Sequence, residues 1–362
     1  MKLFNCLNCG QLLYFENGHC EKCGLVLGFK SDELKLFPLV EKKESVFSIF
    51  GRDDQQLYRY CKNHEYKVCN WLVPEEQVSD YCRACSFNRT IPNLSKQEYR
   101  QRWNVIENGK HRLIFQLLQM RLPLVNKVEN AETGLLFDFM ADDETNGEKK
   151  ILTGHDNGVI TLNIAEADDV EREMTRKGMA EVYRTVLGHF RHEVGHYYWD
   201  RLIDNSPFLD ECRELFGDDS IDYGEALKVH YKEGAPKDWN SHFISAYAST
   251  HPWEDWAETW AHYLHIIDTL QTAYSFGLSV HPNVPTSSAI HNAEIKADPY
   301  ELSDFNVIIN QWIPLTFALN SVNRSMGLQD LYPFVIPADV VDKLKFIHKV
   351  CTHDRIQHNK SM

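Results

Sequence analysis

The sequence of 362 residues predicts an α+β fold, in which a small cysteine-rich module at residues 1–90 precedes a mainly helical domain with a small sheet at residues 91–362. Eight of the ten cysteines stand within the first 85 residues. Apolar runs typical of strands occur at residues 135–139 and 159–164, and helical periodicity dominates from about residue 179 onward. Strands that precede helices, rather than alternating with them along the chain, indicate α+β organisation.

Composition and charge restrict the class of function. Apolar residues make up 43% and charged residues 25%, which is ordinary for a globular protein. The net charge of −14 gives no electrostatic support to binding of nucleic acid or an anionic membrane. We expect no membrane span and, because Met1–Cys6 lacks the features of a secretory signal, a cytoplasmic location. Thiols stay reduced there, so the clustered cysteines indicate metal binding rather than disulfides.

The first cysteine group consists of two Cys-x-x-Cys pairs, each followed by a glycine, Gly10 or Gly24. Glycine permits the tight turn that such a pair needs, and four thiolates can surround one Zn²⁺ tetrahedrally. Residues 12–15 between the pairs are predicted as a short strand that turns at Asn17 and Gly18. The pattern indicates a zinc ribbon with the ligands Cys6, Cys9, Cys20 and Cys23.

The second cysteine group is more widely spaced, and it predicts a second structural zinc with the ligands Cys61, Cys69, Cys82 and Cys85. His64 could replace Cys61 as a ligand. Zinc ribbons often bind nucleic acid, but lysine and arginine do not cluster in this module. Docking of a protein partner through the ribbon and a purely structural role are both open.

The remaining elements follow in order along the chain. Residues 31–54 are predicted as a connector between the cysteine groups. Ser95 is placed to cap a helix over residues 99–118. A polar loop is expected at residues 142–150, between the two predicted strands. Helices are predicted at residues 179–203, 253–270, 305–322 and 338–350.

One of these helices carries a five-residue motif, His192-Glu193-Val194-Gly195-His196. Two histidines four residues apart lie on one face of a helix, one turn apart, and can share a metal ion. Glu193, next to the first histidine, is placed to take a proton from a metal-bound water and pass it to a leaving amine. The motif therefore predicts a catalytic zinc site.

A third ligand is needed for that site. Some zinc peptidases place a glycine and a histidine shortly after the second motif histidine, but Trp199 and Leu202 occupy those positions here. Other zinc peptidases take a glutamate from a later helix, with a second acidic residue four positions on. Glu254 and Glu258 fit this spacing, with Glu254 as ligand and Glu258 as hydrogen-bond acceptor for a ligand histidine.

Three alternatives remain open at this point. Asp222 could supply the third ligand instead of Glu254. His262 or His265 could also do so, and Glu258 could exchange roles with Glu254.

Taken together, these motifs resemble a bacterial family of gluzincin-like zinc-binding metallopeptidases that carry an N-terminal zinc ribbon. The resemblance covers the chain from Cys6 to about Ala273, and it implies a zincin-like fold and a peptidase activity without fixing a substrate. It rests on the ribbon, Cys69-Asn70-Trp71, Cys82, Cys85, Thr90-Ile91-Pro92, Tyr183-Arg184, the stretch from Gly188 to Trp199, Ser245-Ala246-Tyr247-Ala248 and His251-Pro252-Trp253-Glu254-Asp255-Trp256-Ala257-Glu258.

A narrower resemblance concerns one helix. Glu254-x-x-Ala257-Glu258 is similar to the zinc-binding helix of anthrax lethal factor-like peptidases. Those peptidases carry a catalytic tyrosine seven residues before the ligand glutamate, where this chain has Tyr247. The resemblance implies that the Tyr247 phenol stabilises an oxyanion.

The sequence thus predicts zinc-dependent hydrolysis of a peptide or protein substrate, with one catalytic and two structural zinc ions. Residues 159–164 resemble the edge strand on which such enzymes hold an extended substrate. The alternative is a non-catalytic zinc scaffold or adaptor protein, whose helical site would need a fourth protein ligand such as His189, His251 or His262.

Overall fold

The computed structural model describes residues 2–53, 55–142, 151, 153–178, 183–284 and 291–360. The chain forms two compact units, Met1–Phe190 and Arg191–Met362, and each is described by itself. The cysteine-rich ribbon lies in the first unit, and the second unit is mainly helical. The α+β fold class predicted from the sequence is confirmed.

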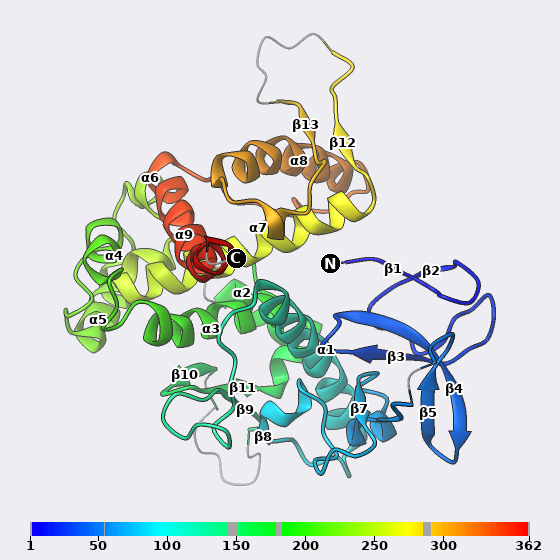
Figure 1. Ribbon diagram of the computed structural model, residues 1–362. Helices are drawn as coiled ribbons and strands as arrows, with labels where there is room; N and C mark the ends of the chain where they lie inside the picture. Colours follow the sequence, from blue (N-terminus) through cyan, green and yellow to red (C-terminus); the bar gives the residue numbers. More distant parts are fainter. Residues whose placement is uncertain are drawn as a thin grey trace. The chain divides into compact units, whose positions relative to one another are not determined.

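The first unit begins with a two-stranded ribbon, β1 (Phe4–Asn5) and β2 (Leu12–Leu13). A five-stranded antiparallel sheet follows, in the order β3-β4-β5-β6-β7 (Figure 1). Its buried side chains include Phe37, Leu39 and Ile49, which form one hydrophobic cluster. The strands are β3 (Leu27–Lys30), β4 (Lys35–Lys43), β5 (Val46–Ile49), β6 (Tyr58–Tyr60) and β7 (Leu72–Pro74).

The prediction of a connector at residues 31–54 is wrong, because β4 and β5 occupy most of this segment. The two strands pair as a hairpin whose turn includes Ser45 at a positive φ of 59°. Consecutive buried residues in β4, including Leu36 and Phe37, replace the apolar–polar alternation that would mark a strand in the sequence.

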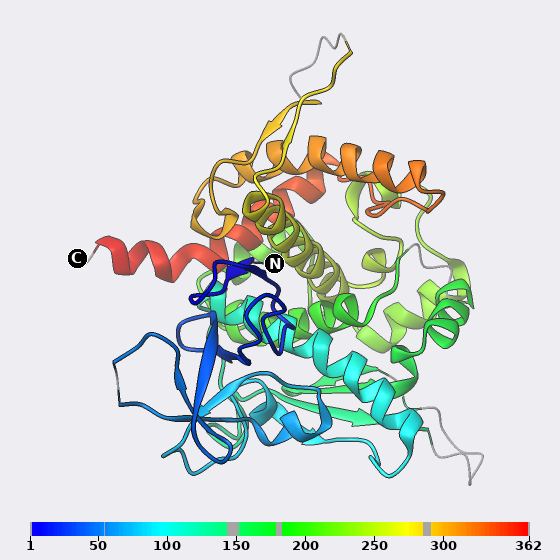
Figure 2. The same cartoon turned by 90° about the vertical axis from the view of Figure 1, so that its right-hand side faces the viewer.

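Helix α1 (Gln97–Met120) agrees with the helix predicted over residues 99–118. The prediction that Ser95 caps it is wrong: Lys96 is the N-cap residue, without a side-chain hydrogen bond. The Ser95 hydroxyl instead donates to Asn93 Oδ1 at 2.8 Å. Figure 2 shows α1, in cyan, beside the strands of a second sheet in the same unit.

This second sheet has four strands in the order β10-β11-β9-β8. Strands β9 and β11 match the strands predicted at residues 135–139 and 159–164 to within a residue. Most of the predicted polar loop at residues 142–150 lies outside the described residues. The strands are β8 (Asn88–Thr90), β9 (Leu136–Met140), β10 (Gly154–Asp156) and β11 (Val159–Asn163).

The prediction that residues 159–164 form an edge strand is wrong. Strand β11 pairs in parallel with β9 on one side and antiparallel with β10 on the other. Asn157 and Gly158, with φ of 41° and 76°, turn the chain between β10 and β11. Asn-Gly is the preferred sequence for such a two-residue hairpin turn, so β10 rather than β11 lies at this edge.

Helix α3 (Val186–Leu202) starts later than the helix predicted from residue 179. Residues 183–185 are not helical, and residues 179–182 lie outside the described part of the chain. Thr185 Oγ1 accepts a hydrogen bond from the Gly188 amide at 3.0 Å. This bond satisfies a free amide at the start of the helix. Before α3 come the 3₁₀ helices η1 (Lys62–Tyr66), η2 (Cys85–Phe87) and η3 (Ile164–Ala167) and helix α2 (Asp169–Gly178).

In the second unit, helix α7 (Pro252–Ser275) packs against α4, α8 and α9 (Figure 1). It is largely buried, including the tryptophans Trp256 and Trp260. Helices α7, α8 and α9 match the helices predicted from residues 253, 305 and 338. The other elements are α4 (Leu209–Phe216), α5 (Tyr223–Glu233), α6 (Trp239–His242), η4 (Tyr247–Thr250), β12 (Ser279–Val280), β13 (Ala293–Glu294), η6 (Pro299–Glu301), α8 (Phe305–Ser325) and α9 (Ala338–Lys360).

Candidate metal centres

The structure brings the first four cysteines together. The Sγ atoms of Cys6 and Cys23 lie 3.7 Å apart, and those of Cys9 and Cys20 lie 3.5 Å apart. Ligands at the usual Zn–S distance in a tetrahedral site would be separated by about 3.8 Å. All four thiols are free of disulfides, and their sulfur atoms converge. The cluster therefore has the donors and the spacing of a tetrahedral zinc site.

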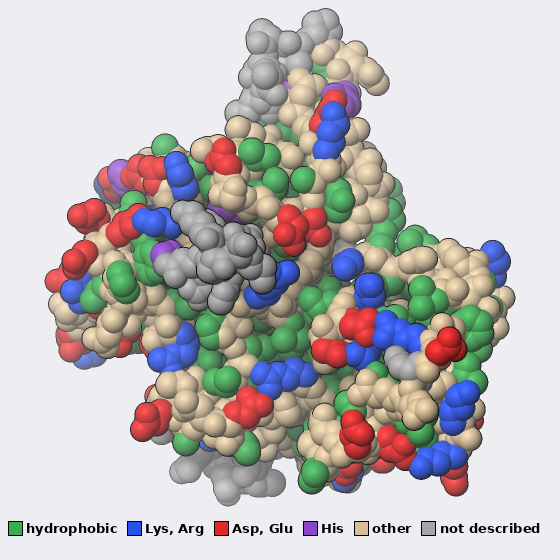
Figure 3. Space-filling model, viewed as in Figure 1, with side chains coloured by type: hydrophobic (Ala, Val, Ile, Leu, Met, Phe, Trp, Pro, Cys, Tyr) green, Lys and Arg blue, Asp and Glu red, His purple; other side chains and the backbone are tan. Residues whose placement is uncertain are grey.

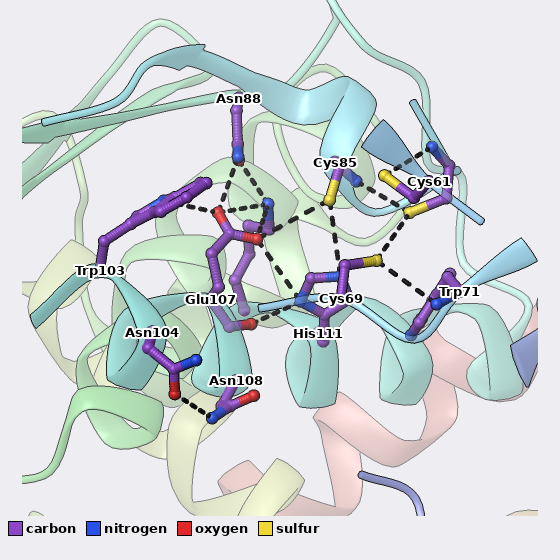
Figure 4. Close-up of polar contacts among 12 residues, drawn as sticks. Cys61, Cys69, Trp71, Cys85, Asn88, Trp103, Asn104, Glu107, Asn108 and His111 are labelled. Atoms are coloured by element: carbon purple, nitrogen blue, oxygen red, sulfur yellow. Dashed lines mark hydrogen bonds and ion pairs between the residues drawn. The ribbon is translucent and has the colours of Figure 1, made fainter. Parts of the chain in front are cut away.

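The second cysteine cluster is entirely buried and also converges (Figure 4). Cys69 Sγ lies 3.7 Å from Cys82 Sγ. The backbone amides of Trp71 and Cys82 donate to the sulfurs of Cys69 and Cys61, both at 3.4 Å. His64, the alternative ligand, bonds through Nδ1 to the Cys69 carbonyl and lies outside the group. The fourth donor in this cluster is thus Cys61, together with Cys69, Cys82 and Cys85.

Helix α1 supports the second cluster with buried charged side chains that the sequence analysis missed. Glu107 accepts hydrogen bonds from Asn88 at 2.7 Å and from Lys110 at 3.0 Å (Figure 4). His111 Nε2 lies 3.6 Å from Cys85 Sγ. Burial disfavours the Cys85 thiolate, but the neighbouring thiols and the Lys110 ammonium hold the pKa of Cys85 well below its usual range. A low thiol pKa favours the metal-binding form.

A third cluster forms in the second unit, where α3 and α7 approach closely. A Cβ atom on Gly195 would lie 3.0 Å from Ala257 Cα, which is tighter than an ordinary contact, so the absence of a side chain on Gly195 permits this close approach. The close approach brings together the three residues that the sequence predicts as ligands of the catalytic zinc. His192 Nε2 lies 3.2 Å from His196 Nε2 and 3.1 Å from Glu254 Oε2. The distance from His196 Nε2 to Glu254 Oε2 is 3.5 Å.

These distances fit a tetrahedral metal site. Nitrogen and oxygen ligands at the usual distances to zinc would be separated by about 3.3 Å. Glu254 Oε2 is buried and has no hydrogen-bond donor among the described residues. Burial disfavours a charged His192, yet Glu254 and Glu258 hold its pKa well above its usual range. The two carboxylates therefore favour a positive charge at the position between the three ligand atoms, where a metal ion would bind.

His192 is oriented by a chain of two hydrogen bonds. Its Nδ1 lies 2.7 Å from Glu258 Oε1. A carboxylate only accepts, so Nδ1 donates to Glu258. In the neutral form of the ring, which is the form that binds a metal, the Nε2 lone pair is then available. The Ser245 hydroxyl donates to Glu258 Oε2 at 2.7 Å. Ser245 lies in the Ser245-Ala246-Tyr247-Ala248 motif, but nothing in that motif predicts its hydrogen bond to Glu258.

Three more groups surround the ligands. Glu193 is buried, and burial raises the pKa of its carboxyl group above the usual range, as suits proton transfer near neutral pH. Tyr247 Oη donates to Glu254 Oε1 at 3.0 Å. Tyr223 Oη donates to the same oxygen at 2.5 Å. Tyr223 was missed, because its contact with Glu254 joins residues far apart in the sequence.

The alternative third ligands bond elsewhere. Asp222 Oδ1 accepts from the Glu225 amide and caps α5. His262 Nδ1 lies 2.7 Å from the Tyr332 hydroxyl, and His265 Nδ1 lies 2.6 Å from an Arg191 nitrogen.

The two remaining candidates for a fourth ligand also interact with other groups. His251 Nδ1 accepts from the Trp253 amide at 3.0 Å, so its Nε2 donates to the Ile221 carbonyl at 3.1 Å. His189 pairs with Glu166 at 3.6 Å. Within the described part of the chain, the third cluster therefore holds three converging ligands.

Comparison with known proteins agrees with these clusters. Residues 99–350 match a family described as "putative zinc-binding metallo-peptidase", and residues 3–96 match a zinc-ribbon domain. The chain belongs to this metallopeptidase family. Its relatives include uncharacterized proteins of Mycobacterium bovis and Mycobacterium tuberculosis, each 44% identical over 351 residues, which is 97% of this chain and 95% of the relative. No solved structure matches the chain significantly.

Family membership indicates zinc-dependent hydrolysis, and the two cysteine clusters supply donors that suit zinc. No helix in the described ranges is long and apolar enough to cross a membrane. On the face seen in Figure 3, basic side chains lie among acidic ones, without a large basic patch.

Proposed function

We propose that this metallopeptidase hydrolyses peptide bonds in a peptide or protein substrate with a zinc ion held by His192, His196 and Glu254. The observation that carries the proposal is the convergence of these three ligand atoms within 3.1–3.5 Å of one another. Glu193 lies directly beside the first ligand on α3. The two cysteine clusters would hold two further, structural zinc ions.

The residues of the cluster divide the chemistry between them. A zinc ion bound there would lower the pKa of a water molecule and polarise the scissile carbonyl group. Glu193 takes a proton from the attacking water and delivers it to the leaving amine. Glu258 holds the orientation of His192, and Ser245 holds Glu258. The Tyr247 hydroxyl donates a hydrogen bond to the oxyanion that forms on the carbonyl.

A structural role for the third cluster would need a fourth side-chain ligand. Three converging ligands and an adjacent glutamate instead match the arrangement of a catalytic zinc, which keeps one position open. The geometry therefore favours the enzyme over a zinc scaffold, and it favours the gluzincin arrangement with Glu254 as the third ligand.

The first prediction tests this proposal with Glu193→Gln. The amide cannot exchange protons as a carboxylate does, so we expect hydrolysis of a fluorogenic peptide library to fall by about 10²-fold or more. Zinc content should stay unchanged, because Glu193 is not a ligand. Glu233→Gln, at an exposed position in the same unit, is the matched control and should keep full activity. Undiminished hydrolysis by Glu193→Gln would contradict the mechanism.

A further inference from the structure

The two carboxylate oxygens of Glu254 have different neighbours. Oε2 faces the two histidine nitrogens at 3.1 and 3.5 Å. Oε1 accepts hydrogen bonds from two tyrosine hydroxyls, Tyr223 at 2.5 Å and Tyr247 at 3.0 Å. Two donors on Oε1 keep that oxygen engaged, so that Glu254 can offer a metal ion Oε2 alone.

The two tyrosines come from different elements. Tyr247 belongs to η4, which packs directly against α7. Tyr223 is the first residue of α5, a helix that has no buried residue. The Tyr223 ring makes edge contacts with Trp253 and His251, at centroid distances of 5.7 and 5.3 Å. These contacts aim the Tyr223 hydroxyl at Glu254, although α5 itself is exposed.

The presence of two donors resolves a conflict in the role of Tyr247. A phenol has one proton to donate, and Tyr247 cannot give it to Glu254 and to an oxyanion at the same time. When Tyr247 turns to a substrate, Glu254 Oε1 would lose its only donor if Tyr223 were absent. A carboxylate with a free second oxygen can bind a metal through both oxygens, which would fill the position that the substrate needs.

We infer that Tyr223 is a positioning residue, which holds Glu254 Oε1 so that Glu254 binds the metal through Oε2 alone and Tyr247 is free to act on the substrate. The effect on metal binding stands without any hydrolysis, whereas the release of Tyr247 rests on the proposed function. Hydrogen-bond partners of metal ligands commonly contribute 10-fold to 100-fold to metal affinity.

The test measures the affinity of the third cluster for zinc by competition with a chromophoric chelator, in full-length protein whose cysteine clusters are loaded. His196→Ala, which lacks the third cluster, gives the baseline. We expect Tyr223→Phe to weaken zinc binding by about 10-fold or more. Tyr231→Phe, which removes the hydroxyl of an exposed tyrosine on the same helix, is the matched control and should bind as the wild type does.

Cobalt placed in the third cluster alone supplies a spectroscopic readout. Tyr247→Phe keeps the Tyr223 donor to Glu254 Oε1 and should keep the wild-type spectrum. The double variant Tyr223→Phe/Tyr247→Phe leaves Oε1 without either donor and should show the weaker visible absorption of a higher coordination number. Wild-type affinity in Tyr223→Phe, or a wild-type spectrum in the double variant, would overturn the inference, as would an equal loss of affinity in Tyr231→Phe. Neither measurement uses a substrate. A failure of the inference about Tyr223 can therefore be told apart from a failure of the proposed peptidase activity.

Discussion

Around the third cluster, several polar side chains near the candidate ligands have defined hydrogen-bond partners. Ser245 illustrates this, because its hydroxyl both donates to Glu258 Oε2 at 2.7 Å and accepts from the Ala248 amide at 3.0 Å. Glu258 in turn bonds to His192 Nδ1. The orientation of the candidate ligand His192 thus depends, through Glu258, on a serine from another segment of the chain.

The second prediction concerns this serine. Ser245→Ala removes the donor that fixes Glu258, and we expect zinc to leave the third cluster to a chelator about 10-fold faster than in the wild type. Ser249→Ala is the control, because the Ser249 hydroxyl bonds to the Ala246 carbonyl in the same segment and not to Glu258. Equal release rates in the two variants would show that Ser245 does not position the ligand.

The third prediction follows from a buried histidine on α7. Burial lowers the pKa of His262 to about 4. The unfolded chain binds a proton at this residue as the pH falls below about 6.5, whereas the folded chain does not. Folding stability contributed by His262 is therefore present at pH 7 and is lost as the pH falls from about 6.5 toward 4, by on the order of 1–2 kcal/mol between pH 7 and pH 5.

His262→Gln removes this titration and can keep a hydrogen bond to the Tyr332 hydroxyl. Unfolding by urea, measured on both proteins at pH 5, 6 and 7, gives the difference between their free energies of unfolding at each pH. Loss of metal in acid affects both proteins and cancels in this difference. The stability of the wild type should fall relative to the variant toward pH 5, and parallel curves would contradict the prediction.

Single residues could be predicted from the sequence where the chemistry is local. The cysteine pairs and His192-Glu193-Val194-Gly195-His196 place their donors through short, fixed spacings, so the sequence alone suggests the clusters that the structure brings together. The contact of Tyr223 with Glu254 joins residues 31 positions apart. Such contacts depend on tertiary packing, which leaves no periodic signal in the sequence.

At the scale of elements, the candidate site depends on how closely α3 and α7 pack. Gly195 stands at the contact, where a Cβ atom would lie 3.0 Å from Ala257 Cα and 3.2 Å from the Trp260 side chain. The two helices carry His192 on one side and Glu254 on the other. Their separation therefore sets the distances between the candidate ligands.

The fourth prediction is that Gly195→Ala forces these helices apart. We expect a loss of about 1–3 kcal/mol in the free energy of unfolding, because the added methyl group overpacks the contact, together with weaker zinc binding at the third cluster. Thermal unfolding and chelator competition measure the two effects. Gly154→Ala is the control, since its Cβ atom would meet nothing within 4 Å. Unchanged zinc affinity in Gly195→Ala would contradict the dependence on helix packing.

Long helices were the most predictable elements, because α1, α7, α8 and α9 carry apolar residues at helical spacing over several turns. Strands were less predictable from the sequence than helices. The pairing of β11 with β10 depends on an Asn157-Gly158 turn that the sequence analysis did not use, and this pairing removes β11 from the edge of its sheet. Edge position is a property of the sheet and not of one strand's sequence.

In the molecule as a whole, the candidate metal sites are divided between the two compact units. The two cysteine clusters lie in Met1–Phe190, and the cluster of two histidines and a glutamate lies in Arg191–Met362. Each cysteine cluster offers four thiolates, as structural zinc sites do. The third cluster offers three ligands beside a glutamate, as catalytic zinc sites do. We therefore expect three zinc ions per chain, one of them at the third cluster.

The fifth prediction concerns the zinc content per chain, measured by elemental analysis on the wild type and on His196→Ala. We expect about three ions in the wild type and about two in the variant, because His196 belongs to the third cluster alone. The cysteine clusters should keep their ions in both proteins. The same zinc count in both proteins would mean that the third cluster binds no zinc, and it would rule out the proposed catalytic site.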